Sequence, residues 1–241
     1  MSIETHQITV GNLSVAVVRK AIKNLHIGVY PPHGRVRVAA PLAVSDEAVG
    51  LAVISRLGWI RRQQRRFEVQ PRQSQRAMVS GESHYFLGQR YLLRVHEQSG
   101  AGSVVVQGKV RLDLFVRPGI SAEQREVVLQ CWYRLQLRDL IPPLLEKWQQ
   151  ILSVEVAEWG IKRMRTKWGS CNRAARRVWL NLELAKKPVR CLEYIVVHEL
   201  AHLRERHHNE RFTGLLDTHL PQWRMCRDEL NQLPLGYEEW C

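Results

Sequence analysis

The feature that most constrains this chain is the segment 194–208, YIVVHELAHLRERHH, in which His198, Glu199 and His202 stand in the order H-E-x-x-H. Residues four apart lie one above the other on a helix, so the two histidines face the same side. Apolar residues recur around them at helical spacing, which predicts an amphipathic helix with a buried stripe. The stripe consists of Leu192, Ile195, Val196, Leu200 and Leu203.

Two imidazoles at this spacing can bind one metal ion, and a glutamate one position along lies beside the ion's open coordination position. Zinc peptide hydrolases use such a pair with a glutamate that activates a zinc-bound water. The motif therefore predicts a Zn²⁺ site with ligands His198 and His202 and with Glu199 as the catalytic carboxylate. The alternative is a surface helix that carries two histidines by coincidence, because the chain contains 10 His.

A catalytic zinc site needs a third protein ligand. His208 follows His202 by six residues, a step that a continuous helix would turn through about 600°. We therefore expect the helix to end near Glu205 or Arg206 and the chain to fold back. We favour His208 as the third ligand, with His207 as its main competitor. Weaker candidates are Glu205, Glu210 and Asp217.

Composition and cysteine usage bound the class of protein. With 241 residues, 45% of them hydrophobic, the chain can bury a substantial core in one large domain or two small ones. No stretch reaches the length of a transmembrane helix and the N-terminus lacks signal-peptide features, so we expect no membrane contact. Five scattered cysteines without a C-x-x-C pair favour a reducing, cytoplasmic location.

The chain is strongly basic, with 36 Lys+Arg against 23 Asp+Glu and a formal net charge of +13, which favours contact with polyanions. A helix starting at Ser45 is predicted to carry much of the densest basic patch on its polar side. A solvated helix face is one interpretation, and a nucleic-acid or acidic-partner surface is the other. No aromatic side chains interleave with the patch. This Arg61–Arg76 basic face comprises Arg61, Arg62, Arg65, Arg66, Arg72 and Arg76.

Short β-rich runs separated by turn residues dominate residues 1–118, and helical patterns dominate residues 119–241. Ser121 and Gln124 form a predicted capping box for a helix that Pro142-Pro143 should break or kink. A strand over residues 177–184 is either an exposed edge that can hold an extended peptide or part of an ordinary buried hairpin. No internal repeat is evident, and the sole candidate domain boundary lies near Pro118-Gly119.

Several segments carry a resemblance to a known family: WGSC at 168–171, LNL at 180–182, the H-E-x-x-H helix and HNERF at 208–212. Further similar segments are Ala40-Pro41, Trp59-Ile60, YFLGQRY at 85–91 and LPQW at 220–223. Together they resemble the YgjP-like metallopeptidases, SprT-related minimal zincins of the gluzincin kind, over nearly the whole chain. The resemblance implies zinc bound by His198, His202 and His208, with Glu199 as the catalytic residue, in an α+β fold.

We therefore predict an α+β protein with a β-rich N-terminal subdomain, 1–118, and a mainly helical zincin-like metallopeptidase subdomain, 119–241, that includes a short β-hairpin. Its predicted function is zinc-dependent hydrolysis of a peptide or protein substrate. One alternative is a zinc-stabilised, basic nucleic-acid-binding or adaptor module without proteolytic activity. Another is a zinc hydrolase acting on other substrates.

Supporting residues around the site are also predicted. Carboxylates should orient the ligand histidines, and the candidates are Glu193, Glu205 and Asp217. Gly169 would let its loop approach the metal cleft, because glycine lacks a Cβ. Cys171 is predicted to be a small buried side chain rather than a reactive thiol or a fourth ligand. No single residue is singled out as the donor to the oxyanion.

Overall fold

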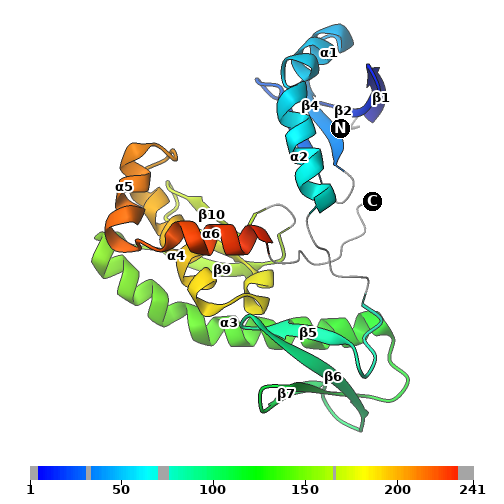
Figure 1. The fold of residues 1–241 in the computed structure, drawn as a ribbon, viewed down its shortest axis with the longest axis vertical. Helices are drawn as coiled ribbons and strands as arrows, with labels where there is room; N and C mark the ends of the chain where they lie inside the picture. The colour runs from blue at the N-terminus through cyan, green and yellow to red at the C-terminus, as the bar shows by residue number, and fades with distance from the viewer. Residues whose placement is uncertain (1–4, 31–33, 70–75, 165–166, 233–241) are drawn as a thin grey trace. The chain divides into compact units, whose positions relative to one another are not determined.

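A computed structural model describes residues 5–30, 34–69, 76–164 and 167–232 (Figure 1). The predicted α+β fold class is confirmed. The chain divides into two compact units between Arg72 and Gln73. The sequence places the boundary near residue 118 instead, which lies inside the second unit. The strands that precede this point share one hydrophobic core with the helix that follows it.

The first unit contains one four-stranded sheet and two helices. Its elements are β1 (Thr5–Val10), β2 (Leu13–Lys20), β3 (His26–Tyr30), β4 (Arg35–Pro41), α1 (Asp46–Ser55) and α2 (Leu57–Val69). The strand order is β1-β2-β4-β3, with β2 and β4 parallel and both outer pairs antiparallel. Alternating valines of β2 and β4 pack against the helices, because every second side chain of a strand points to the same face.

The basic helix of the first unit departs from its predicted form. Ser45 caps α1 as expected, since its Oγ accepts from the Ala48 amide at 3.2 Å. The helix ends at Ser55, however, where the Arg56 amide bonds back to Val53, and α2 begins anew. The predicted basic face is therefore distributed over different parts of the chain. Arg61, Arg62 and Arg65 are exposed on α2, Arg76 belongs to the second unit beside Glu82, and the Arg66 side chain and Arg72 lie outside the described residues.

The second unit begins with another four-stranded sheet. Its strands are β5 (Ser83–Phe86), β6 (Gln89–Glu97), β7 (Ser103–Gln107) and β8 (Arg111–Val116). They follow the order β5-β6-β8-β7, with β6 and β8 parallel and both outer pairs antiparallel. Strand order and directions therefore equal those of the first sheet, and a Ser-capped helix follows each sheet. The chain thus contains a structural repeat where the sequence analysis found none.

The helix α3 (Ala122–Leu152) covers this second sheet and extends beyond it. Its predicted capping box is confirmed, with the Gln124 amide bonded to Ser121 Oγ at 3.3 Å and the Ser121 amide bonded to Gln124 Oε1 at 2.9 Å. The break expected at Pro142 and Pro143 does not occur. Both prolines are exposed, and so are Arg138 and Asp139, whose carbonyls lose their helical donors and can bond to water.

The rest of the second unit consists of a small sheet and the C-terminal helices. These elements are β9 (Glu158–Lys162), β10 (Gly169–Asn172), β11 (Arg177–Asn181), η1 (Leu182–Lys186), α4 (Val189–Arg204), α5 (Glu210–His219) and α6 (Trp223–Gln232). The strand order β10-β11-β9 makes β11 the central strand. The strand predicted over 177–184 therefore belongs to a hairpin, and the edge beside α4 is β10. The strand β11 ends at Asn181, and not at residue 184 as predicted, because the Asn181 side chain caps the following 3-10 helix η1. It accepts from the Glu183 amide at 3.2 Å.

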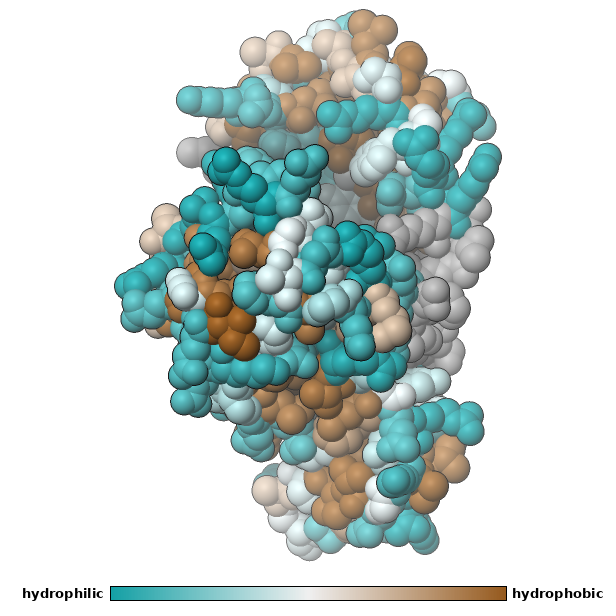
Figure 2. All heavy atoms as spheres, turned by 60° about the vertical axis from the view of Figure 1, so that its left-hand side comes forward, coloured by the Kyte–Doolittle hydropathy of each residue, from teal (hydrophilic) through white to brown (hydrophobic). Residues whose placement is uncertain are grey.

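Hydrophilic and hydrophobic side chains are interspersed on the face drawn in Figure 2. Among the described helices, none combines the length and hydrophobicity that crossing a lipid bilayer requires. Even the 31-residue α3 alternates buried with exposed polar positions along its length.

Candidate metal centre

The predicted motif lies on α4, which is held in the core of the second unit. Pro188 precedes the first turn, and the predicted apolar stripe is buried, with Leu203 partly so. The helix contacts α3, α5, α6, β10 and β11. Because so many elements pack against its other faces, α4 holds the backbone of His198, Glu199 and His202 in a fixed orientation at the edge of the core.

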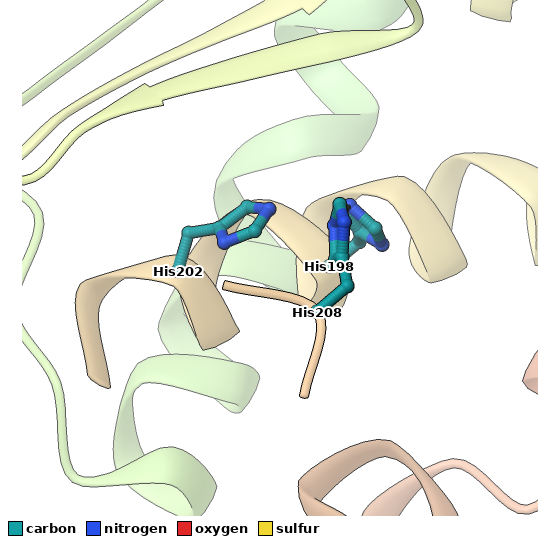
Figure 3. A group of neighbouring side chains, drawn as sticks. All are labelled: His198, His202 and His208. Carbon is teal, nitrogen blue, oxygen red and sulfur yellow. Dashed lines mark hydrogen bonds between the residues drawn. The ribbon is translucent and has the colours of Figure 1, made fainter. Parts of the chain in front are cut away.

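The three predicted ligands converge on one point (Figure 3). His198 Nε2 and His208 Nε2 are 3.1 Å apart, and one ligand atom from each of the three histidines lies within 4.8 Å of the others. Ligand nitrogens around a tetrahedral zinc ion with Zn–N distances of about 2.0–2.1 Å lie roughly 3.4 Å apart. The His198–His208 pair is close to this separation, and the 4.8 Å limit for the whole group is wider. Among the described residues, this group includes none of the competing candidates His207, Glu205, Glu210 and Asp217.

The end of α4 brings His208 back to the other two histidines. The helix stops at Arg204 and Glu205 adopts an extended conformation, which confirms the predicted helix end. His208 lies just before Asn209, whose side chain caps α5 by accepting from the Phe212 amide at 3.0 Å. The Phe212 ring packs against all three imidazoles, with centroid distances of 4.7–5.0 Å. A buried aromatic ring thus forms one wall of the metal centre.

His198 and His202 each have a hydrogen-bond partner at Nδ1, which leaves Nε2 of each ring directed toward the other two histidines. The His202 Nδ1 donates to the Glu205 carbonyl at 3.1 Å, which leaves Nε2 with its lone pair free for a metal. The Tyr194 hydroxyl lies 3.5 Å from His198 Nδ1, on the side of the ring away from His208. Burial lowers the pKa of His198 to about 3 and also lowers the pKa of His202. Neutral imidazole is the form that binds metal ions.

The carboxylates predicted to orient the histidines have other partners. Glu193 Oε1 accepts from Trp148 Nε1 at 2.9 Å and from Lys147 at 2.8 Å. Asp217 Oδ1 accepts from Trp223 Nε1 at 2.8 Å. Glu205 acts through its backbone carbonyl rather than its side chain. The prediction was therefore wrong in its choice of groups, since a helix-end carbonyl and the Tyr194 hydroxyl hold these positions.

Glu199 is buried between α4 and β10, with 5% of its surface exposed. A Cβ on Gly169, the first residue of β10, would lie 2.6 Å from Glu199 Oε1 and 2.7 Å from its Cγ. The close approach predicted for Gly169 is thus present, and it requires glycine. Burial raises the pKa of Glu199 to about 8, while the positive charge of Lys167 lowers it. A carboxyl that titrates near neutral pH can both accept and release a proton.

A cleft with a volume of about 1010 Å³ opens over these groups and is lined by Glu199 and all three histidines. Cys171 also lines the cleft, half-buried, and burial raises the pKa of its thiol to about 11, so it is uncharged at neutral pH. It is absent from the metal-ligand group of the described residues. The sequence analysis did not identify Asn181, Tyr194 or Phe212 as supporting residues, although the motifs behind the family resemblance include all three.

The chain was compared with curated proteins and with solved structures. A search of curated proteins found no match. Solved structures that are similar over a limited part of the chain include two metallopeptidase zymogens. One is the metallopeptidase zymogen of Pyrococcus abyssi abylysin, at 20% identity and a TM-score of 0.35, covering 36% of this chain and 89% of that one. The other is the metallopeptidase zymogen of Methanocaldococcus jannaschii jannalysin, at 21% identity and 0.35, covering 38% and 94%.

The family comparison covers far more of the chain. The model of the YgjP-like metallopeptidase domain matches residues 23–233, a span that includes most of the first unit and the whole metal centre. The chain therefore belongs to the YgjP-like metallopeptidase family.

Proposed function

We propose that this metallopeptidase hydrolyses peptide bonds with a zinc ion held by His198, His202 and His208. The observation that supports this most directly is the convergence of three imidazoles beside one buried carboxylate. Three protein ligands leave a fourth position for water or substrate, which is the pattern of catalytic zinc sites. A closed structural site would need a fourth protein ligand, and the described residues supply none within the group.

A zinc ion bound there would lower the pKa of a water molecule and polarise the scissile carbonyl. Glu199 would accept a proton on its carboxylate from the attacking water and deliver it to the leaving amine. Its pinned position supports this role, because Gly169 and the α4 backbone fix the carboxylate at the edge of the cleft. The carbonyl of Glu205 and the hydroxyl of Tyr194 would keep His202 and His198 oriented.

The decisive experiment compares metal content and peptide hydrolysis in four single variants of the full chain. Glu199→Gln should retain zinc and lose hydrolysis by a factor of about 10³ or more, because proton transfer is lost. His202→Ala and His208→Ala should lose zinc, measured by elemental mass spectrometry. His207→Ala is the matched control, since this exposed neighbour of His208 lies outside the ligand group and should leave both readouts unchanged.

Each variant can contradict the proposal. Wild-type-like hydrolysis by Glu199→Gln would remove Glu199 from the chemistry. Zinc loss in His207→Ala with retention in His208→Ala would exchange the third ligand. The nucleic-acid partner predicted for the Arg61–Arg76 basic face stays a prediction, as does the cytoplasmic location. Exposed Arg61, Arg62 and Arg65 on α2 are equally consistent with a solvated helix face.

A further inference from the structure

The rim of the metal cleft carries a large excess of positive charge. Four exposed basic side chains line it from four separate segments: Lys167 before β10, Arg173 after β10, Arg206 after α4 and Arg227 on α6. Among the described lining residues, Glu199 is the only carboxylate, and it is buried. Cations on several sides of a cleft add their fields at its centre, where a substrate binds.

Most of this charge is not neutralised by neighbouring carboxylates. No ion pair joins Lys167, Arg173 or Arg206 to an acidic side chain within the described part of the chain. Only Arg227 has such a partner, because its Nε lies 3.0 Å from Asp228 Oδ1. Some exposed arginines elsewhere in the described chain do pair, as Arg176 does with Glu155 and Arg190 with Glu229. The cleft is thus a place where cations are left available for a ligand.

Hydrogen bonds hold the backbone of Lys167 and the guanidinium of Arg173 in place. The buried Asn181 side chain donates to the carbonyls of Lys167 at 2.7 Å and Met164 at 2.9 Å, which holds these two backbone positions beside the end of β11. The Arg173 Nη2 donates to the Arg204 carbonyl at 3.1 Å, at the last residue of α4. The backbone of Lys167 and the guanidinium of Arg173 are therefore held at the two ends of β10.

The strand between them suits a peptide ligand. β10 pairs with β11 on one side only, so its other edge has backbone donors and acceptors without strand partners in the described sheet. An extended peptide can add to such an edge, advancing about 3.3 Å per residue. A peptide lying there would pass Gly169 and the Glu199 carboxylate, with Lys167 toward one end and Arg173 toward the other. Six residues of a fully extended peptide would span about 20 Å, which is the upper limit for the separation of Lys167 and Arg173 along this segment.

We propose that the substrates of this site are acidic peptide segments, with Asp or Glu on both sides of the scissile bond. This inference rests on the proposed peptidase function and adds its specificity. Side-chain carboxylates on either side of the bond would face Lys167 at one end of β10 and Arg173 at the other, with Arg206 and Arg227 adding to the field. The free strand edge favours a polypeptide over other anions, because it binds main chain.

The test uses three quenched fluorescent peptides of equal length and identical central residues. Their flanks carry Asp/Glu, Asn/Gln or Lys. With the zinc-loaded full chain at low salt, kcat/KM should be about tenfold or more higher for the acidic peptide than for the neutral one, and lowest for the lysine peptide. Added salt should shrink the ratio, because exposed charges are screened. An Arg173→Gln/Arg206→Gln variant should lower the acidic-to-neutral ratio severalfold, since it removes two of the four cations that line the cleft. Arg138→Gln is the matched control and should leave the ratio unchanged, because Arg138 is an exposed residue of α3 that does not line the cleft.

The outcomes separate this inference from the function on which it rests. Equal cleavage of acidic and neutral peptides overturns the specificity and leaves the peptidase intact. Cleavage of none contradicts the proposed function; binding of the same peptides to zinc-loaded Glu199→Gln, read by fluorescence anisotropy, then decides the specificity separately. Acidic and neutral peptides bound equally would overturn it. So would a short oligonucleotide that displaces the acidic peptide and binds more tightly than it, since the basic rim would then serve nucleic acid.

Discussion

The two four-stranded sheets of this protein share strand order and directions, yet only the second supports the metal centre. In the second unit the β5–β6 turn bonds directly to the segment before α4, with the Leu87 amide 2.9 Å from the Ala185 carbonyl and the Gly88 amide 3.2 Å from the Lys186 carbonyl. In the first unit, no described atom lies within 4 Å of a Cβ placed on Gly11, in the matching β1–β2 turn. The same strand arrangement thus occurs twice, and only the second copy is hydrogen-bonded to the segment that precedes the helix of the candidate metal ligands.

The helices that follow the two sheets also differ in whether they contact the elements of the metal centre. In the first unit α1 and α2 are short and close one small core. In the second unit α3 continues past the sheet and contacts η1 and α4. The Tyr133 hydroxyl donates to the Tyr85 carbonyl at 2.6 Å, which joins α3 to β5. A disturbance of the second sheet should therefore reach the metal centre, and the same disturbance of the first should not.

The largest expected effect comes from core truncation in each unit. Leu137 on α3 and Ile60 on α2 are both fully buried, so each change to Ala should cost about 2–5 kcal/mol of its unit's stability. Leu137→Ala should release zinc at a lower urea concentration than the wild type does, whereas Ile60→Ala should release it at the same concentration as the wild type. The measurement follows tryptophan fluorescence and zinc release to a chromophoric chelator during urea unfolding. Equal shifts of zinc release in both variants would refute the separation of the two units.

The second prediction compares the two turn glycines. Both have positive φ, +83° at Gly88 and +64° at Gly11, so alanine strains either turn by about 1–2 kcal/mol. A Cβ at Gly88 would also lie 2.6 Å from Pro188 Cγ, at the start of α4. Gly88→Ala should therefore cost about 2–3 kcal/mol and weaken zinc binding, whereas Gly11→Ala costs the strain alone. Thermal unfolding and zinc titration of both variants check this; zinc affinity unchanged in Gly88→Ala would break the proposed link.

What could be predicted from the sequence was local. His198 and His202 are four residues apart on a patterned helix, and the end of that helix follows from the distance that His208 must return. The capping residues Ser45 and Ser121 were found because a cap depends on residues three apart. The reasoning from spacing favoured His208 as the third ligand with His207 as its competitor, and the family resemblance implied His208 as well. These parts of the site needed no knowledge of which elements meet in space.

The missed features depend on contacts between distant segments. Gly88 and Pro188 are 100 positions apart, and no periodicity relates them. The edge position of β10 follows from β9 pairing with β11, a parallel pair that the sequence pattern did not reveal. The repeat was hidden because the two sheets share an alternation of apolar residues rather than particular side chains. The orienting group of His202 is a backbone carbonyl, which has no sequence signature.

A third prediction compares how the stabilities of the two units depend on pH. His84 on β5 is 5% exposed, and burial lowers its pKa to about 4. In the unfolded chain a histidine titrates near 6.5, so between pH 6.5 and 4 the unfolded state binds a proton that the folded state does not. The stability of the second unit should therefore fall as the pH falls through this window, by about 1.5 kcal/mol from this group between pH 6.5 and 5.

The matching histidine of the first sheet, His6 on β1, is half-exposed beside Asp46 and has no comparable burial. Urea unfolding at several pH values, compared between wild type and His84→Gln, isolates the contribution of His84, because the other histidines of the second unit remain in both. The variant should show the smaller loss of stability over this range. Identical slopes would mean that the folded protein accommodates a protonated His84.

The smallest expected effect concerns an ion pair that joins the start of a helix to the end of a strand in each unit, with opposite polarity in the two units. In the first unit Asp46, in the first turn of α1, pairs with Arg19 near the end of β2. In the second unit Arg125, in the first turn of α3, pairs with Glu97 at the end of β6, at 3.3 Å. A negative charge is favourable at a helix N-terminus and a positive one is not. Asp46→Asn should therefore cost about 1 kcal/mol and Glu97→Gln about 0.5 kcal/mol or less, since both acids are substantially exposed.

Urea unfolding at low and high salt tests this, and both losses should shrink as salt screens the charges. Suppose that Glu97→Gln lowers the free energy of unfolding as much as Asp46→Asn does at low salt. The attraction between the two charges would then determine the loss, and the sign of the charge at the helix N-terminus would have no effect.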